Sequence, residues 1–443
     1  MAAQPPGLLV IGASEILTMA GGPRGGTAQA ETASIRLEPA AASEVSVAPA
    51  VAVFEGRIVG VGTRREVEGA LREHGVEPAG IGIVDAKGGV LTPGLIDPHS
   101  HLLFAGTRHA ELVMRQRGFS YLDILAAGGG ILQTVRHTRT ASDDQLLEHG
   151  RRWLSEMLSH GVTTVEAKSG YGLDTASELR LLELAGRLGA VGPIEVVPTF
   201  LGAHAVAQEY RDRPDAVAAY LAHVIEDQLP AVADQGIAQS CDVFCERGVF
   251  EPVHARRLLE AARKRDLAVR LHADELHESG GAELAAEIGA LSADHLAAVG
   301  DHGLDALGRT ADVGRPVVAT LLPATTFYLL SERYAPARRL IERGVPVALG
   351  TDFNPGTSPT PNIQLALSLA TLRLGMSAAE ALVGATINAA AALGLQESHG
   401  SLEPGKHADM VVWDVESYEQ IPYWLGARLA RTVIKRGRVV LDT

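Results

Sequence analysis

Eight short apolar runs alternate with helical patterns along the middle of this 443-residue chain, and this alternation constrains its fold most strongly. Such alternation predicts βα units and a parallel sheet, and eight units predict a (β/α)8 barrel. A barrel needs about 250 residues, so the length leaves room for an added module. The candidate strands are residues 90–96, 162–167, 195–200, 241–245, 268–272, 293–296, 316–321 and 346–351, and the helical segments are residues 143–158, 175–188, 216–228, 251–264, 280–288 and 377–393.

Both ends of the chain predict antiparallel strands instead of βα units. Residues 51–61 have the pattern of a β-hairpin that turns at Glu55-Gly56, and residues 432–441 have that of another that turns at Arg436-Gly437. A short turn with glycine between two apolar runs is typical of a tight hairpin. Residues 408–414 alternate between polar and apolar positions, as a half-buried strand does.

Neither end has enough strands to be stable alone. We therefore expect residues 1–90 and 397–443 to pair into one composite β domain beside a barrel of residues 91–396. Two separate terminal modules are the less favoured alternative. Residues 20–48 are rich in Gly, Ala, Ser and Thr, which predicts a long loop or a partly disordered insertion.

The composition limits the partners and the compartment. The net charge of −14 repels phosphate backbones and anionic lipids, so we expect neither nucleic acid nor a membrane as a partner.

Cys241 and Cys245 are the only cysteines, which excludes a disulfide framework and favours a reducing compartment. We interpret them as buried small side chains, although a Cys-x-x-x-Cys pair could contribute to a metal site. With no signal-peptide pattern and no apolar run of about 18 residues, a cytoplasmic location is expected.

Polar side chains follow the candidate strands at the places where a barrel enzyme carries its active site. In this fold the site lies at the C-terminal ends of the strands. Residues scattered over the surface would not follow the strand ends in this way. The side chains concerned are His99, His101 and Arg108 after the first strand, Lys168 and Tyr171 after the second, His204 after the third, His272 and Glu275 at the fifth, His295 at the sixth, and Asp352 and Asn354 after the eighth.

His99 and His101 predict a metal site. Residues two apart on a strand point to the same face, and with His272 and Asp352 they form a set of three imidazoles and one carboxylate. Such a set suits Zn²⁺, and also Fe²⁺ or Mn²⁺. We expect one ion, because no lysine ends the fourth candidate strand to bridge a second. The alternatives are a chance His-Ser-His on a loop, a core role for His272 and a capping role for Asp352.

Glu275 and His295 predict proton transfer beside this ion. A divalent ion lowers the pKa of a bound water toward about 7. Glu275 follows His272 closely, so it can accept the proton of this water and pass it to a leaving nitrogen. His295 is a second candidate for proton transfer or for polarising an oxyanion. Glu275 could instead be a solvated member of an acidic run, and His295 a core histidine.

Further residues predict substrate binding. Arg108 can form a bidentate pair with a carboxylate, and Tyr171 and His204 can bind other polar substrate atoms. The run from Asn354 to Thr357 offers an amide and backbone N–H groups. Ordinary loop structure remains the alternative for each of them.

Longer motifs carry a family resemblance. The segment PGLIDPHSH is similar to the amidohydrolase superfamily as a whole, and the longer matches are similar to a branch that opens a cyclic amide in histidine degradation. The resemblance covers nearly the whole chain, although residues 20–48 are longer than its pattern. The matches are DPHSHLLFAGTR (97–108), EAKSGYG (166–172), TFLGAH (199–204), DVFCE (242–246), LHADE (271–275), SADH (292–295) and GTDFNPG (350–356).

The resemblance implies a distorted (β/α)8 barrel with a small β-sandwich, and hydrolysis of 4-imidazolone-5-propanoate to N-formimidoyl-L-glutamate. It also implies one Zn²⁺ or Fe²⁺ ion, a small-molecule substrate and a homodimer. Position by position, it implies that the metal is bound by His99, His101, His272 and Asp352, the substrate by Arg108, Tyr171, His204 and Glu275, and the product by Asn354, Gly356 and Thr357, with Glu275, His295 and Asp352 as the catalytic residues.

Two other functions compete with this one. A cytosine or guanine deaminase of the same superfamily would share the metal ligands and Glu275, but a neutral base needs no carboxylate clamp such as Arg108. A non-catalytic scaffold on the same fold would be expected to have lost metal ligands, whereas all four candidates are present. The hydrolase is therefore the favoured hypothesis.

Overall fold

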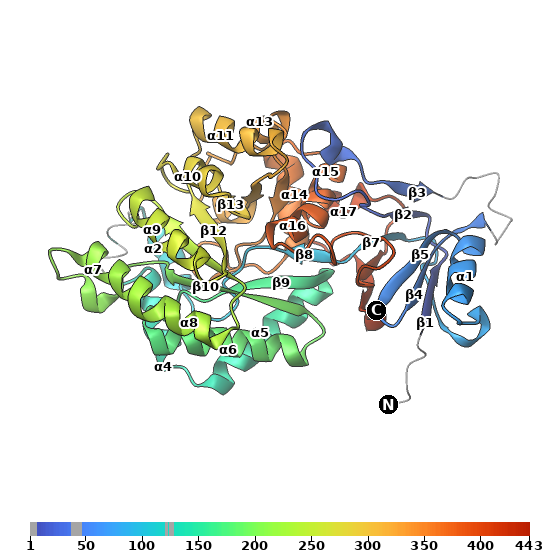
Figure 1. Ribbon diagram of the computed structural model, residues 1–443, viewed down its shortest axis with the longest axis horizontal. Coiled ribbons are helices and arrows are strands. Elements are labelled where there is room, and N and C mark those ends of the chain that lie inside the picture. The colour runs from blue at the N-terminus through green and yellow to red at the C-terminus, as the bar shows by residue number, and fades with distance from the viewer. Residues whose placement is uncertain (1–6, 37–46, 120–122, 124–127) are drawn as a thin grey trace.

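A barrel of parallel strands forms the centre of the protein (Figure 1). The computed structural model describes residues 7–36, 47–119, 123 and 128–443. Within them the eight-stranded sheet has the order β15-β14-β13-β12-β11-β10-β9-β8, and every neighbouring pair is parallel. The strands are β8 (Leu95–Asp97), β9 (Val162–Lys168), β10 (Glu195–Ala203), β11 (Ser240–Cys245), β12 (Ala268–Ala273), β13 (Ser292–His295), β14 (Val318–Leu321) and β15 (Val347–Leu349).

The first and last strands of this sheet meet just beyond their carboxyl ends. The backbone N–H of Asp352 donates to His99 O, and that of His101 donates to Phe353 O, each over 2.9 Å. These bonds close the barrel, which confirms the predicted (β/α)8 fold. The closure also holds His99 and Asp352 side by side, although they lie near opposite ends of the barrel sequence.

Helices surround the barrel, as Figure 1 shows. The helices expected near residues 143–158, 175–188, 251–264 and 280–288 are confirmed. Ser142 and Asp174 cap two of them by accepting a backbone N–H of the first turn. Within the described part of the chain, no helix is long and apolar enough to cross a membrane. The helices are α2 (His109–Gln116), α4 (Ile131–Thr140), α5 (Asp143–Ser159), α6 (Thr175–Val191), α9 (Pro252–Arg263), α10 (Gly281–Ile288), α11 (Asp301–Asp312), α12 (Pro323–Tyr328), α13 (Ala337–Glu342) and α14 (Ile363–Arg373).

Two predicted helices are interrupted. Residues 216–228 end in a π-helical turn before Pro230, which has no N–H to continue the regular bonding ladder. Residues 377–393 break at Thr386, whose backbone is not helical. The resulting elements are α7 (Ala216–His223), η6 (Val224–Gln228), α8 (Leu229–Gln235), α15 (Ala378–Gly384) and α16 (Ile387–Ala392).

Strands from both ends of the chain form a β-sandwich beside the barrel (Figure 1). One sheet has the order β18-β17-β16-β7-β2-β3 and the other β5-β4-β1-β6, and both contribute to one buried apolar cluster. Both predicted hairpin turns are confirmed, because Glu55 and Arg436 have φ of 50° and 47° and a glycine of positive φ follows each. The division at residues 1–90 and 397–443 stays a prediction. The strands are β1 (Gly7–Ile11), β2 (Glu15–Leu17), β3 (Ser34–Arg36), β4 (Pro49–Phe54), β5 (Arg57–Thr63), β6 (Gly82–Asp85), β7 (Val90–Pro93), β16 (Met410–Trp413), β17 (Ala430–Lys435) and β18 (Arg438–Asp442).

The single strand predicted at residues 90–96 is wrong. Within residues 90–96 the chain passes from the sandwich to the barrel, because β7 pairs with β16 of the sandwich whereas β8 pairs with β9 of the barrel. Gly94 lies at the change, and its N–H donates to Asp409 O over 2.9 Å. The run is buried and apolar on both sides of Gly94, so its composition contains no sign that two sheets share it.

Replacing Gly94 with alanine is expected to destabilise the protein by about 1–3 kcal/mol, because a Cβ there would overlap the buried side chain of Thr163. Urea unfolding measures the difference. Gly80→Ala is the matched control, since a Cβ at Gly80 would meet no other atom. Equal unfolding midpoints for the two variants would contradict this account of the junction.

The loop expected at residues 20–48 is ordered in its first part. It contains η1 (Gly26–Ala30) and β3. The side chain of Gln29 is buried and bonds to both backbone groups of Val347 in the barrel, donating over 2.9 Å and accepting over 3.0 Å. The alternative of a partly disordered insertion is therefore wrong for residues 20–36, which form a loop with one short helix and one short strand, and residues 37–46 lie outside the described residues.

Candidate active site

Four side chains converge at the carboxyl end of the barrel. His99 and His101 follow β8, His272 lies in β12 and Asp352 follows β15. Asp352 Oδ1 lies 3.4 Å from His101 Nε2 and 3.5 Å from His99 Nε2, and the ring centroids of His99 and His272 are 4.5 Å apart. All four are buried. The structure thus brings together the residues that the sequence singled out for metal binding.

This group of side chains fits a divalent metal ion. Candidate ligand atoms here lie within 4.8 Å of one another in two overlapping sets, one of His99, His101 and Asp352 and one that joins His99 and His272 to the neighbouring His295. Among the described residues, the buried Nε2 atoms of His99 and His272 have no hydrogen-bond partner. Leaving a buried nitrogen unpaired costs free energy. A cation would satisfy both atoms, and imidazole with carboxylate is a donor set that zinc and iron accept.

Two buried carboxylates lie close to the Nδ1 atoms of His99 and His272. Asp294 Oδ2 lies 2.7 Å from His99 Nδ1, and Asp242 Oδ2 lies 3.0 Å from His272 Nδ1. A carboxylate at Nδ1 favours the tautomer that is protonated there and leaves Nε2 free to bind a metal. Sequence reasoning gave neither carboxylate a role. The available signal was a charged residue inside a buried strand, because such residues are rarely buried unless they are paired.

Beneath these carboxylates lies a network of fully buried charges. Lys168 Nζ lies 2.7 Å from Asp242 Oδ2 and 2.8 Å from Glu166 Oε2. Arg270 Nη1 lies 2.6 Å from Glu166 Oε1, and Arg270 Nη2 lies 3.2 Å from Asp294 Oδ2. The sequence pointed to Lys168 as a support for the site, and it contacts the carboxylate that faces His272. Glu166 and Arg270 were not foreseen.

Burial keeps the His99 and His101 imidazoles neutral, which is the form that binds metals. It lowers the pKa of His101 to about 4. It lowers the pKa of His99 well below its usual range, and the charge of Lys168 lowers this pKa further. Burial alone would raise the pKa of the Asp352 carboxyl, but hydrogen bonds from His101 and Thr325 help to bring it down to about 2. The carboxylate is therefore ionised and ready to bind a cation.

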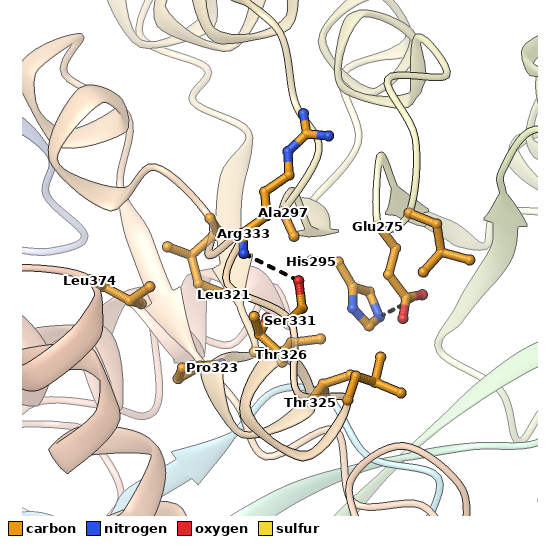
Figure 2. Close-up of a pocket in the computed structure, with 14 residues that line it drawn as sticks. Glu275, His295, Ala297, Leu321, Pro323, Thr325, Thr326, Ser331, Arg333 and Leu374 are labelled. Atoms are coloured by element: carbon orange, nitrogen blue, oxygen red, sulfur yellow. Dashed lines mark hydrogen bonds and ion pairs between the residues drawn. The ribbon is translucent and has the colours of Figure 1, made fainter. Parts of the chain in front are cut away.

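Glu275 and His295 lie together beside the four-residue group. Glu275 Oε2 is 3.7 Å from His295 Nε2, and Figure 2 shows both side chains in one pocket. Burial, and then the nearby charge of Asp352, raise the pKa of Glu275 to about 8, so its carboxyl can hold or release a proton near neutral pH. His295 and Asp352 have φ of 76° and 52°, a strained conformation that clusters at active sites.

The pocket continues from this pair towards α12. Thr325 and Thr326 of α12 line it together with Ser331 and Arg333 (Figure 2). Thr325 Oγ1 also donates to Asp352 Oδ2 over 2.7 Å. The same wall therefore shapes the pocket and orients the carboxylate.

Tyr171 and His204 lie beside His101. The His204 ring stacks on His101 with centroids 4.8 Å apart, and the Tyr171 ring is 5.7 Å from His101. Burial raises the pKa of Tyr171 and lowers that of His204, so both are neutral and can offer hydrogen bonds. The buried Glu178, which sequence reasoning missed, accepts three backbone N–H groups around Tyr171 and fixes this loop.

Arg108 is only partly available as a clamp. Its Nε and Nη2 atoms form a bidentate pair with Glu111, at 2.9 and 2.8 Å. A Cβ at Gly356 would overlap Arg108 Nη1, which places this atom against the loop after β15. The Nε–Nη2 edge of Arg108 is thus occupied by Glu111, and the pairing of Arg108 with a substrate carboxylate stays a prediction.

The run from Asn354 to Thr357 does not offer the free donors that were expected. Asn354 Oδ1 accepts the N–H groups of Gly356 and Thr357, each over 2.8 Å. Asn354 Nδ2 donates to Asp352 O and to Thr357 Oγ1. An asparagine at the start of a turn often bonds its own backbone in this way, and the contact of this run with a ligand stays a prediction. The run therefore shapes the wall of the site.

Known proteins match this chain over most of its length. Residues 90–440 match the amidohydrolase family. The imidazolonepropionase of Geobacillus kaustophilus (strain HTA426) is 50% identical over 390 residues, which are 88% of this chain and 89% of that relative. The imidazolonepropionase of Symbiobacterium thermophilum is 46% identical over 440 residues, which are 99% of this chain and 98% of that relative.

Solved structures of lower identity share the fold. An adenosine deaminase from Xanthomonas campestris with bound zinc superposes with a TM-score of 0.67 at 18% identity, covering 99% of this chain and 94% of that one. A 5-methylcytosine deaminase from Klebsiella pneumoniae, liganded with phosphonocytosine, has a TM-score of 0.70 at 16% identity and covers 98% of each chain. At such identities the likeness shows the fold alone.

Proposed function

This chain belongs to the amidohydrolase family, and we propose that it hydrolyses 4-imidazolone-5-propanoate to N-formimidoyl-L-glutamate. It is a hydrolase that acts on a C–N bond of a cyclic amide. The observation that carries the proposal is the meeting, at one end of the barrel, of a metal-ligand set, the Glu275–His295 pair and a guanidinium group. The relatives of 50% and 46% identity, named imidazolonepropionase, support the choice of substrate.

The enzyme uses a divalent metal ion, and we assign it to one Zn²⁺ or Fe²⁺ held by His99, His101, His272 and Asp352. The unpaired Nε2 atoms and the ionised carboxylate support this assignment. A bound ion would activate a water and polarise the lactam carbonyl. A single ion is supported by the pairing of Lys168 with Glu166 and Asp242, because a lysine engaged in this way is not free to bridge a second metal.

Glu275 and His295 move the protons. Glu275 accepts a proton from the attacking water as its oxygen bonds to the lactam carbon. When the ring C–N bond breaks, Glu275 returns this proton to the departing ring nitrogen, and the carbonyl becomes a carboxylate. His295, 3.7 Å from Glu275, donates a hydrogen bond to the developing oxyanion. Asp352 orients the metal ligands at the centre of the site.

Arg108 faces the propanoate tail, and Tyr171 and His204 bind the polar atoms of the ring. The hydrogen-bonded run of Asn354, Gly356 and Thr357 forms the wall that contacts the product. Holding the tail in this way would place the lactam carbon over the metal site and make the attack effectively unimolecular.

A homodimer is proposed, without nucleic acid or membrane as a partner, in the cytoplasm. The net charge of −14 supports the absence of polyanionic partners, because it repels them.

The first experiment is a direct assay. The purified, metal-loaded protein is expected to consume freshly generated 4-imidazolone-5-propanoate, followed by its ultraviolet absorbance, and to yield N-formimidoyl-L-glutamate by mass. Treatment with a chelator such as dipicolinate should abolish turnover, and added Zn²⁺ or Fe²⁺ should restore it, because the metal supplies the activated water. Turnover of cytosine or guanine in place of the imidazolone would instead favour a deaminase, and turnover that survives complete metal removal would exclude the assigned centre.

A further inference from the structure

We propose that Arg115 is a second carboxylate-binding residue of this site, and that it, together with Arg108, selects substrates with an anionic tail. This inference rests on the proposed function and deepens it. Arg108 directly precedes α2, and Glu111 and Arg115 lie on one face of this helix because they are spaced four residues apart.

Arg108 alone is a weakened anion receptor. Glu111 takes its Nε–Nη2 edge in a bidentate pair, and both side chains are largely buried, at 10% and 6% exposure. Glu111 also accepts the N–H of Gly130 over 2.7 Å, so it is held from two sides. Because the pair is neutral as a unit, Arg108 supplies a positioned N–H but little net attraction for a carboxylate.

Arg115 places a second guanidinium at the same wall. Its Nη2 donates to Gly356 O over 3.3 Å, and a Cβ on Gly356 would overlap Nη1 of Arg108. The two guanidinium groups therefore meet at one glycine. The Arg115 guanidinium also lies 5.2 Å from the ring centroid of Tyr328 at the end of α12, the helix that lines the pocket beside Glu275.

The bonding of Arg115 is incomplete. Its Nε is buried and finds no hydrogen-bond partner among the described residues, and its bond to Gly356 O is longer than the usual range. An unpaired buried N–H costs free energy, so this donor is available to a ligand. A carboxylate between the two arginines would satisfy this donor and give the neutral Arg108–Glu111 unit a cationic neighbour.

The test is a binding measurement that needs no turnover. Calorimetry on the metal-loaded protein compares imidazole-4-propanoate with its amide, imidazole-4-propanamide. The wild type is expected to bind the acid more tightly. Arg115→Met should weaken acid binding at least about tenfold and leave amide binding unchanged, because a charge-assisted hydrogen bond is lost. Arg117→Met is the matched control, since it removes the same charge from an exposed side chain close by.

Several outcomes would overturn the proposal. If Arg115→Met weakened the binding of acid and amide equally, Arg115 would have only a structural role. If Arg115→Met bound the acid as tightly as Arg117→Met does, Arg115 would not belong to the site. If Arg115→Met does not fold, Arg115→Lys should still weaken the acid selectively, because lysine lacks Nε, and unchanged acid binding would count against the proposal. If the wild type preferred the acid but did not hydrolyse 4-imidazolone-5-propanoate, the proposed reaction would be refuted and the carboxylate site supported. If it hydrolysed this substrate without preferring the acid, the carboxylate site would be refuted and the reaction supported.

Discussion

Glu275→Gln is expected to lower kcat by about 10²–10⁴-fold, because general acid–base catalysis contributes roughly this factor. Glutamine has nearly the same shape and can still form hydrogen bonds, but it cannot accept a proton from water or return one to the ring nitrogen. Burial and the charge of Asp352 raise the pKa of Glu275 to about 8, so the wild-type carboxyl is suited to both transfers. Steady-state kinetics with 4-imidazolone-5-propanoate measures kcat, and metal analysis shows whether the centre stays loaded.

A neighbouring glutamate supplies the control for this variant. Glu278→Gln makes the same change in the same acidic run, but Glu278 is exposed and does not line the pocket. We expect its kcat to equal that of the wild type. If Glu275→Gln kept wild-type kcat with a full metal complement, proton transfer would have to be assigned to another group, with His295 as the first choice.

The barrel could be predicted because its signals are local. Each run of apolar residues and each helical period is visible in the sequence without knowledge of its neighbours. The junction at Gly94 was missed because both of its sides are equally apolar and buried. The anchoring of Gln29 was missed for a related reason, since its partner Val347 lies on the far side of the sequence.

The site was predictable where a strand end alone determines position. Parallel strands bring their carboxyl ends to one rim, so His99, His272 and Asp352 had to lie near one another once the barrel was assumed. Whether a side chain is free to bind a ligand could not be predicted in the same way. The sequence placed Arg108 at the rim but could not show that Glu111 occupies one edge of it, because that depends on rotamers.

The buried charges behind the metal ligands could not be paired from sequence. Lys168 and Asp242 come from β9 and β11, two strands that are not neighbours in the sheet. Their contact depends on the register and tilt of the strands around the barrel. Sequence reasoning could therefore give Lys168 a supporting role without identifying the carboxylate that it supports.

The buried charges behind the metal ligands predict a second large mutational effect. Lys168→Met is expected to destabilise the protein by about 3–5 kcal/mol, because it leaves buried carboxylates without their cation. Lys168 is the closest cation to Asp242, at 2.7 Å, and it also lies 3.8 Å from Asp294. Arg270 would still pair with Glu166 and Asp294, but Asp242 would be left without a lysine or arginine partner. Urea unfolding measures the loss.

The same variant should also weaken metal binding by about 10–100-fold, the usual cost of disturbing the partner of a metal-binding histidine. Asp242 would no longer be held against Nδ1 of His272, so Nε2 would be less well aimed at the ion. Competition with a coloured zinc chelator measures the affinity under conditions where the variant is folded. Asp242→Asn should reproduce the loss of affinity, because the amide replaces the charge that favours the ligating tautomer.

Lys264→Met separates this effect from the loss of any lysine, because Lys264 is exposed at the end of α9. It should match the wild type in unfolding midpoint and in zinc affinity. Lys168→Arg should recover part of the stability, since it restores a cation within the network, but the larger planar group must displace its neighbours. If Lys168→Met and Lys264→Met had the same zinc affinity, the alignment of His272 would not depend on the network, and Asp242 would have to hold the ring without help.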